Sequence, residues 1–182
     1  DGSPVADTEL MRRALEKGRA LGLPIIDHSE VPELSGDGVM NEGMLSAKLG
    51  LKGIPSAAEE IMVSRDAELA LFTGSRIHIA HVSAAASVEI IAEAKAKGIR
   101  VTAEVTPHHL TLTEEKVIGY DTNAKVNPPL RTKQDIQALL QGLKEGVIDA
   151  IATDHAPHTE ADKLCEFALA PFGISGLETA FG

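Results

Sequence analysis

The chain has 182 residues, with 17 Lys and Arg against 27 Asp and Glu, which predicts about one domain and a formal charge of −10. Its hydrophobic content of 43% and charged content of 24% exclude a disordered or low-complexity chain. The acidic charge argues against nucleic-acid or membrane partners, and the single cysteine, Cys165, excludes internal disulfides and indicates a reducing, cytoplasmic location.

Two kinds of element alternate along the chain. In order, the sequence predicts a helix over 8–21, a strand over 23–28, a helix over 57–72, a strand over 77–82, a helix over 87–97, a strand over 99–105, a helix over 133–144 and a strand over 147–153. The helices have apolar residues at three- and four-residue spacing, and the strands are short runs rich in Ile, Val and Ala, typical of buried parallel strands. A glycine suited to a left-handed cap follows each helix. This order predicts a parallel α/β sheet, either small and open or part of a barrel.

Side chains that can bind metals follow each predicted strand. They are His28, His81, the pair His108 and His109, and the pair Asp154 and His155. In parallel α/β folds the carboxyl ends of the strands are where ligand-binding and catalytic groups converge. Imidazole nitrogen and carboxylate oxygen are ligands suited to Zn²⁺ or a similar transition ion. The sequence therefore predicts a metal site at this edge of the sheet.

Each of these residues also has a plainer interpretation. A single histidine at a strand end is more often a surface or hydrogen-bonded residue than a ligand. Strand alternation places His78 on the side opposite to the strand-end histidine, so we assign it a structural role. His108 and His109 are adjacent, and at most one of them can face a common site. Asp154 alone could cap a helix, but the proline and polar residues that follow it indicate a loop.

Seven short motifs carry a resemblance to a known family. In chain order they are DGSPV at 1–5, DHSE at 27–30, HIAHVS at 78–83, EVTPHHL at 104–110, NPPLR at 127–131, ATDHAPH at 152–158 and APFG at 170–173. In content, order and spacing the chain resembles the bacterial type I dihydroorotases, which belong to the cyclic amidohydrolase group of the amidohydrolase superfamily. NPPLR and ATDHAPH are the most specific of these strings.

The resemblance implies a fold larger than this chain. Members of the family have a distorted (β/α)8 barrel, and residues 1–182 match its carboxyl-terminal part, about strands five to eight, as one partial barrel domain without the first strands. The family's first strand carries an H-x-H-x-R string that supplies two ligands of one zinc and an arginine for the substrate carboxylate. No such string occurs in this chain. We therefore expect the chain alone to bind metal weakly and to be a poor catalyst.

The resemblance also implies a centre of two zinc ions. By motif match, His28 and His81 would ligate one zinc, and Asp1 would bridge both ions where hydantoinases use a carboxylated lysine. Asp154 would contact a metal and act as general acid and base.

Substrate contacts and the reaction are implied in the same way. Asn127 and His158 match positions that contact the substrate, and the main chain at Phe172 and Gly173 matches the part of a loop that reads the pyrimidine ring. The implied reaction is the reversible interconversion of L-dihydroorotate and N-carbamoyl-L-aspartate in de novo pyrimidine biosynthesis. The substrate is a small molecule, and a homodimer and an association with aspartate transcarbamoylase are the protein partners to consider.

Three other functions stay open at this point. An allantoinase or hydantoinase would use the same metal chemistry on another ring. A non-catalytic dihydroorotase-like subunit that scaffolds aspartate transcarbamoylase would typically lose metal histidines, whereas His28, His81 and Asp154 are present. A plain α/β binding module would leave the polar groups at four strand ends unexplained.

The remaining features are expected to be ordinary. Lys125 and Arg131 flank Asn127 and could attract an anionic substrate, but solvated surface charge is the better interpretation for both. Glu59 and the glutamate after it are typical of an exposed helix face, and Cys165 of a free loop thiol. The long loop over 159–172 is expected to be a lid that closes over the ring.

Overall fold

The computed structural model describes residues 3–180, so the predicted ligand Asp1 lies outside the described residues. The elements are α1 (Thr8–Leu21), β1 (Ile25–Asp27), α2 (Pro32–Ser35), β2 (Met40–Asn41), α3 (Met44–Leu49), β3 (Gly53–Ile54), α4 (Ala57–Thr73), β4 (Ile77–Ile79), α5 (Ala85–Ala96), β5 (Val101–Val105), α6 (Pro107–Thr111), α7 (Lys133–Glu145), β6 (Ala150–Ile151) and α8 (Glu160–Lys163), with single 3₁₀ turns at Glu114–Val117 and Thr122–Ala124. The four long helices begin and end within two residues of the predicted bounds.

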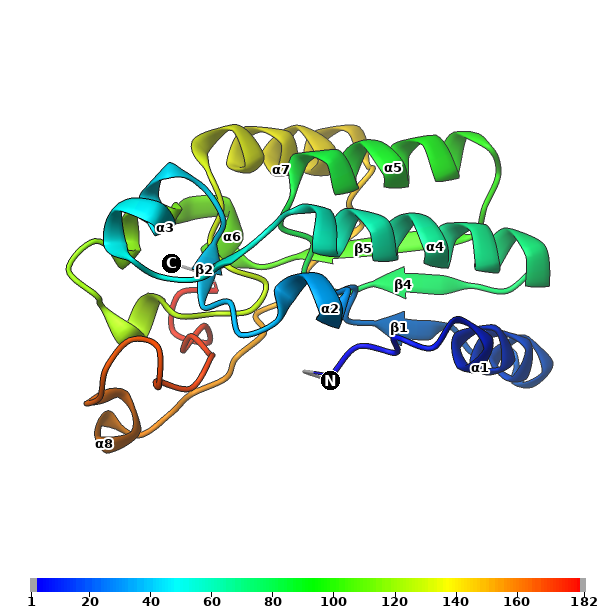
Figure 1. Ribbon diagram of the computed structural model, residues 1–182. Coiled ribbons are helices and arrows are strands. Elements are labelled where there is room, and N and C mark those ends of the chain that lie inside the picture. The colour runs from blue at the N-terminus through cyan, green and yellow to red at the C-terminus, as the bar shows by residue number, and fades with distance from the viewer. Residues whose placement is uncertain (1–2, 181–182) are drawn as a thin grey trace.

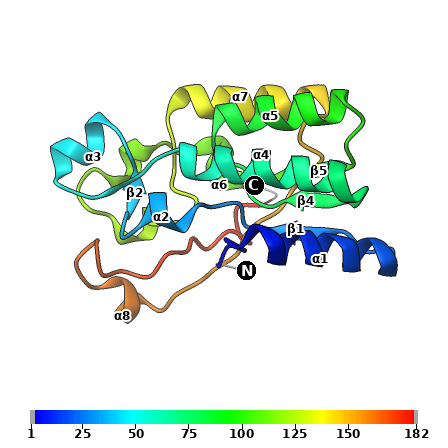
Figure 2. The same cartoon turned by 45° about the vertical axis from the view of Figure 1, so that its right-hand side comes forward.

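The main sheet has four parallel strands in the order β1-β4-β5-β6. Helices α1, α4, α5 and α7 pack next to one another in that order, and α4, α5 and α7 form a layer over the sheet (Figures 1 and 2). The predicted parallel α/β architecture is therefore confirmed. No helix within residues 3–180 combines the length and the apolar composition needed to cross a membrane.

Local sequence signals fix the ends of these helices. The Asp7 side chain caps α1 by accepting a hydrogen bond from the Leu10 amide at 2.7 Å, and Thr132 forms a capping box with Asp135 at the start of α7. At the other ends, Gly22 and Gly146 adopt left-handed φ values of 70° and 73°. A glycine accepts this conformation without a steric penalty, so both helices stop where the sequence predicts.

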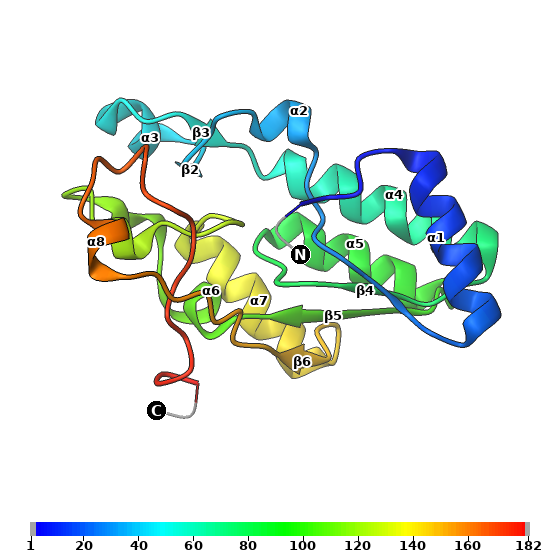
Figure 3. The same ribbon diagram turned by 90° about the horizontal axis from the view of Figure 1, so that it is seen from below.

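The two faces of the sheet differ sharply in burial. Alternate strand residues on the face toward the helices are buried in one apolar cluster with the inner sides of those helices; the strand members include Ile77, Ile79, Val101, Ala103 and Val105. On the opposite face Ile26 is 68% exposed. Figure 3 shows this face from below, with no helix in front of β4, β5 and β6. The described residues therefore cover only one face of the strands that the sequence predicts to be buried.

A second, smaller sheet pairs β2 with β3 in parallel, and the sequence did not predict it. Each of its strands has two residues, too few for a periodic pattern. The Arg131 side chain ties this sheet to the core, because its guanidinium donates to Asn41 Oδ1 and to the Ile54 carbonyl, both at 2.8 Å, and to Ser83 Oγ at 3.1 Å. Arg131 is 3% exposed, so the prediction of solvated surface charge is wrong for this residue.

Glu59 is also buried, contrary to the expectation of an exposed helix face. Its carboxylate accepts hydrogen bonds from the main-chain amides of Ser83 and Ala84 at 3.0 Å and from the Ser83 hydroxyl. These amides lie at the start of α5, where the helix dipole favours a negative charge. The carboxylate of Glu59 therefore fixes the loop that leads from His81 into α5.

Candidate active site

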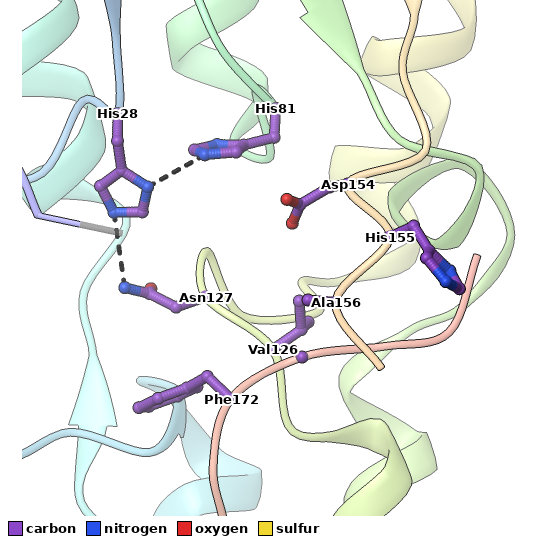
Figure 4. A pocket seen from close by; sticks show the side chains of 9 residues that line it. His28, His81, Val126, Asn127, Asp154, His155, Ala156 and Phe172 are labelled. Carbon is purple, nitrogen blue, oxygen red and sulfur yellow. Dashed lines mark hydrogen bonds between the residues drawn. The ribbon is translucent and has the colours of Figure 1, made fainter. Parts of the chain in front are cut away.

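The carboxyl ends of the main-sheet strands border a pocket of about 300 Å³. His28 follows β1, His81 follows β4 and Asp154 follows β6, and all three line the pocket together with Asn127 and Phe172 (Figure 4). The rest of the lining comes from Val126, His155, Ala156 and Gly173. Six of the residues given a metal or substrate role from the sequence thus line one pocket: His28, His81, Asn127, Asp154, Phe172 and Gly173.

The two imidazoles are in direct contact. His28 Nδ1 lies 2.9 Å from His81 Nε2, and His28 Nε2 lies 2.8 Å from a carboxylate oxygen of Glu30. Asn127 Nδ2 donates to the same Glu30 oxygen at 2.6 Å. A carboxylate only accepts hydrogen bonds, so His28 Nε2 carries a proton, and in the neutral ring Nδ1 accepts from His81 Nε2. Glu30 therefore sets the tautomer and the orientation of His28.

Burial and neighbouring charges shift the acid–base equilibria of this cluster. Burial alone would raise the pKa of Glu30, but hydrogen bonds from His28 and Asn127 lower it to about 2. Burial and the nearby His28 lower the pKa of His81, although the Asp154 charge opposes that shift. Glu30 is therefore ionised, and the site favours a neutral imidazole at His81 at neutral pH.

The backbone is strained at two residues of this pocket. His81 has a φ of 35° and Asp154 a φ of 44°, and Tyr120 is the other non-glycine residue in residues 3–180 with a positive φ. This conformation costs of order 1–3 kcal/mol and tends to persist where a site requires it. At both positions it directs a potential ligand or catalytic group from a strand end into the pocket.

The ring nitrogens of His28 and His81 are suitable ligands for a transition metal, but they do not form a complete metal site. Two ligand nitrogens on a tetrahedral zinc lie about 3.3 Å apart, close to the 2.9 Å between the two imidazoles. His81 Nδ1 is buried without a hydrogen-bond partner. Within residues 3–180, however, no three His, Cys, Asp or Glu side chains converge as a metal-binding group. The described residues therefore offer two nitrogen donors, with the Asp154 carboxylate beside them.

The other strand-end histidines have different environments. His155 lines the pocket, but its Nδ1 accepts from the Gly176 and Leu177 amides at 3.1 and 3.3 Å, and its ring turns away in Figure 4. His109 is buried between Thr106 and the Pro128 carbonyl. His108 is buried with both ring nitrogens unpaired, and burial lowers its pKa to about 4. Neither His108 nor His109 is among the residues that line the pocket.

A segment after β6 forms the remaining wall of the pocket. His158 donates from Nε2 to the Phe172 carbonyl at 2.8 Å and does not itself line the pocket. Gly173 has a φ of 144°, and a Cβ atom there would lie 2.5 Å from the Ala156 carbonyl oxygen. Only glycine therefore fits at this point of the wall.

Two buried lysines hold this wall, and sequence reasoning missed their role. Lys125 was expected to be solvated, but it is 2% exposed; its ammonium donates to the Ala168 carbonyl at 2.9 Å and lies 4.6 Å from the Phe172 ring centre. Lys163 ends α8 and binds the same segment. The loop over 159–172 is thus tethered at several points, while Cys165 within it is an exposed free thiol, as predicted.

Comparison with known proteins gives the family. The model of the dihydro-orotase-like family matches residues 1–104, which is more than half of the chain. The chain belongs to this family. Proteins named dihydroorotase from Pelotomaculum thermopropionicum and Thermoanaerobacter sp. are 62% and 59% identical to the whole chain. The chain spans 43% and 42% of the length of these two members.

Solved structures agree on the fold of this dihydro-orotase-like chain. A D-hydantoinase from Thermus sp. matches 96% of the chain with a TM-score of 0.83 and 26% identity. A dihydropyrimidinase from Brevibacillus agri matches 94% with a TM-score of 0.81 and 25% identity. In each case the chain covers 40% of the other protein.

Proposed function

We propose that this chain forms the carboxyl-terminal part, about strands five to eight, of a distorted (β/α)8 barrel, with residues 1–182 as one partial barrel domain. Three observations support this proposal. One face of the sheet is uncovered, the outer edges of β1 and β6 are unpaired within residues 3–180, and the chain spans 43% of its relative from P. thermopropionicum. In a barrel the uncovered face would point inward and both edges would be paired.

We propose that the protein is a dihydroorotase, which interconverts L-dihydroorotate and N-carbamoyl-L-aspartate in pyrimidine biosynthesis. The observation that carries the proposal is the convergence of His28, His81 and Asp154 at one pocket with Asn127. The relatives named dihydroorotase, at 57–62% identity over the chain, favour dihydroorotate over hydantoin as the substrate.

His28, His81 and Asp154 would hold metal, and we propose two zinc ions in the complete site, with Asp1 as the bridging ligand. Bound divalent ions lower the pKa of water and polarise the attacked carbonyl. His28 is oriented for its role by Glu30, which fixes the ring through Nε2.

Asp154 would move the proton during hydrolysis. Its carboxylate takes a proton from the attacking water as the oxygen bonds to the ring amide carbon. The carbon–nitrogen bond then breaks, and Asp154 returns the proton to the departing nitrogen. Asn127 and His158 would contact the substrate, and the main chain at Phe172 and Gly173 would face the pyrimidine ring and orient it toward Asp154.

The test uses the relative from P. thermopropionicum with its matching segment replaced by residues 1–182, here called the transplanted enzyme. We expect it to hydrolyse L-dihydroorotate with a kcat/KM at least about 100-fold above that for hydantoin or allantoin, the size of a specificity set by ring contacts. The unmodified relative is the control, and the 182-residue chain alone should be poorly active. A transplanted enzyme that is folded but inactive, beside an active control, contradicts the proposal.

Metal analysis tests the ligands without an activity assay. The transplanted enzyme should contain two zinc ions per chain, and His28→Ala and His81→Ala should each lower that content. Light scattering of the same protein, alone and with aspartate transcarbamoylase, tests for the expected homodimer and for that partner.

A further inference from the structure

We propose that Lys163 is a positioning residue of the active site: its buried ammonium holds the main chain at 171–173 in the conformation that faces the substrate ring. The proposal rests on the proposed function, because it assigns a role to a group that supports the ring-facing wall. Lys163 does not itself line the pocket, so it would act through Phe172 and Gly173.

The ammonium of Lys163 makes three hydrogen bonds to carbonyl oxygens. It donates to Pro171 at 2.8 Å, to Gly173 at 2.9 Å and to Thr122 at 3.0 Å. An ammonium has three N–H donors, so all of them are used. The residue is 9% exposed, and the Thr122 hydroxyl donates back to the Lys163 carbonyl at 2.7 Å. The Lys163 ammonium is therefore fully hydrogen-bonded, and it links Thr122 to the segment over 171–173.

The two carbonyls of Pro171 and Gly173 flank Phe172, so the cation determines the path of the chain on both sides of a pocket residue. Other bonds fix the same three residues: the Gly173 amide donates to the Lys125 carbonyl at 2.9 Å, and the Phe172 carbonyl accepts from His158. Gly173 packs against Ala156 with no room for a Cβ atom. Small shifts of this wall would therefore produce steric contact or unpaired groups.

Removal of the ammonium would leave three carbonyl groups without their donor. Charge-assisted hydrogen bonds are about twice as strong as neutral ones, and a buried acceptor without a partner is unfavourable. The expected response is a local rearrangement around Phe172, since α8 keeps its own cap from Thr159 and Asp162. None of the three hydrogen bonds of the ammonium goes to His28, His81 or Asp154, so the strand ends that carry these residues should keep their geometry.

The experiment compares Lys163→Met with Lys144→Met, the same change at an exposed lysine on α7, both in the transplanted enzyme. For Lys163→Met we expect KM for dihydroorotate to rise about tenfold while kcat changes less than about threefold, the pattern expected when binding common to the ground state and the transition state is lost. Zinc content should be unchanged. Lys163→Arg keeps the charge but not the three-way geometry, so we expect an intermediate KM.

Hydrogen exchange gives a readout that does not depend on activity. Amides of peptides that span 168–176 should exchange at least about tenfold faster in Lys163→Met than in Lys144→Met, because the hydrogen bonds from Lys163 to this segment are lost.

Unchanged exchange and an unchanged KM overturn the proposal. A loss of kcat and zinc content together also overturns it, because that result indicates a general structural role. If Lys163→Met does not fold, Lys163→Arg decides by the same two measurements. An inactive transplanted enzyme with Lys163 intact would contradict the proposed function instead, and exchange would still test Lys163.

Discussion

The two faces of the main sheet use the same four strands for different purposes. On the face toward the helices, alternate residues such as Ile79 and Ala103 are fully buried in one apolar cluster. On the other face Ile26 is exposed, and His78 makes hydrogen bonds to Thr102 and Glu104. A second pocket on this side is lined by Ile26 and Glu104 together with His28, His81 and Asp154. The covered face therefore stabilises the fold, and the open face leads to the groups proposed for chemistry.

The first and largest test of this division is Asp154→Asn in the transplanted enzyme. The amide keeps the shape of the side chain but cannot accept the proton, so kcat should fall by about 10²- to 10⁴-fold. The melting temperature should hardly change. Asp37→Asn, at an exposed carboxylate that pairs with Lys52, is the matched control and should leave kcat unchanged. Full activity in Asp154→Asn would remove the acid–base role.

On the covered face, Ile79→Ala should lower the stability of the fold and leave kcat unchanged. Ile79 is completely buried, and truncation of such a side chain costs about 2–5 kcal/mol of the free energy of unfolding. Urea unfolding of the transplanted enzyme measures this loss, and kcat of the folded fraction should be retained. A cost below about 0.5 kcal/mol would contradict the assignment of this face to the stabilising core.

Ile26→Ala tests whether the open face is covered in a complete barrel. If it points into a barrel interior, truncation should lower the free energy of unfolding of the transplanted enzyme by about 1–3 kcal/mol. If the face stays exposed to solvent, the change should lie within about 0.5 kcal/mol. The second result would contradict the partial-barrel proposal while leaving the Asp154 prediction intact.

The last test concerns a buried carboxyl pair on the covered face, Asp66 with Asp27. Burial and the neighbouring Asp27 carboxylate raise the pKa of Asp66 to about 8, although Arg65 opposes the shift. Between about pH 4 and 8 the folded protein therefore holds a proton that the unfolded chain has released, so stability falls as pH rises. The slope is on the order of 1 kcal/mol per pH unit. Melting temperatures of Asp66→Asn across this range should be flatter than those of the parent, and parallel curves would contradict the prediction.

The sequence predicted what local signals encode. The capped helix over 8–21 and the strand ends at His28, His81 and Asp154 follow from periodicity and turn chemistry, and the structure confirms their placement. Burial of long charged side chains does not follow from such signals. The environment of Arg131 depends on Asn41 and Ile54, which are distant in sequence and lie in strands too short to detect.

The same reason explains why Lys163 was missed and Lys125 misjudged. A lysine in a polar loop is usually solvated, and only the folded path of residues 166–173 brings main-chain carbonyls to these ammonium groups. The pairing of Glu59 with the start of α5 likewise joins two segments through tertiary structure. Each of these contacts depends on the tertiary structure, so no local sequence pattern could predict it.

The left-handed backbone at His81 and Asp154 has a consequence for protein engineering. Glycine at either position would relieve local conformational energy, so screening for heat resistance alone would favour replacing the side chains that the proposed chemistry requires. Directed evolution of this protein should therefore keep both residues unchanged, because otherwise it will enrich thermostable variants that no longer turn over substrate.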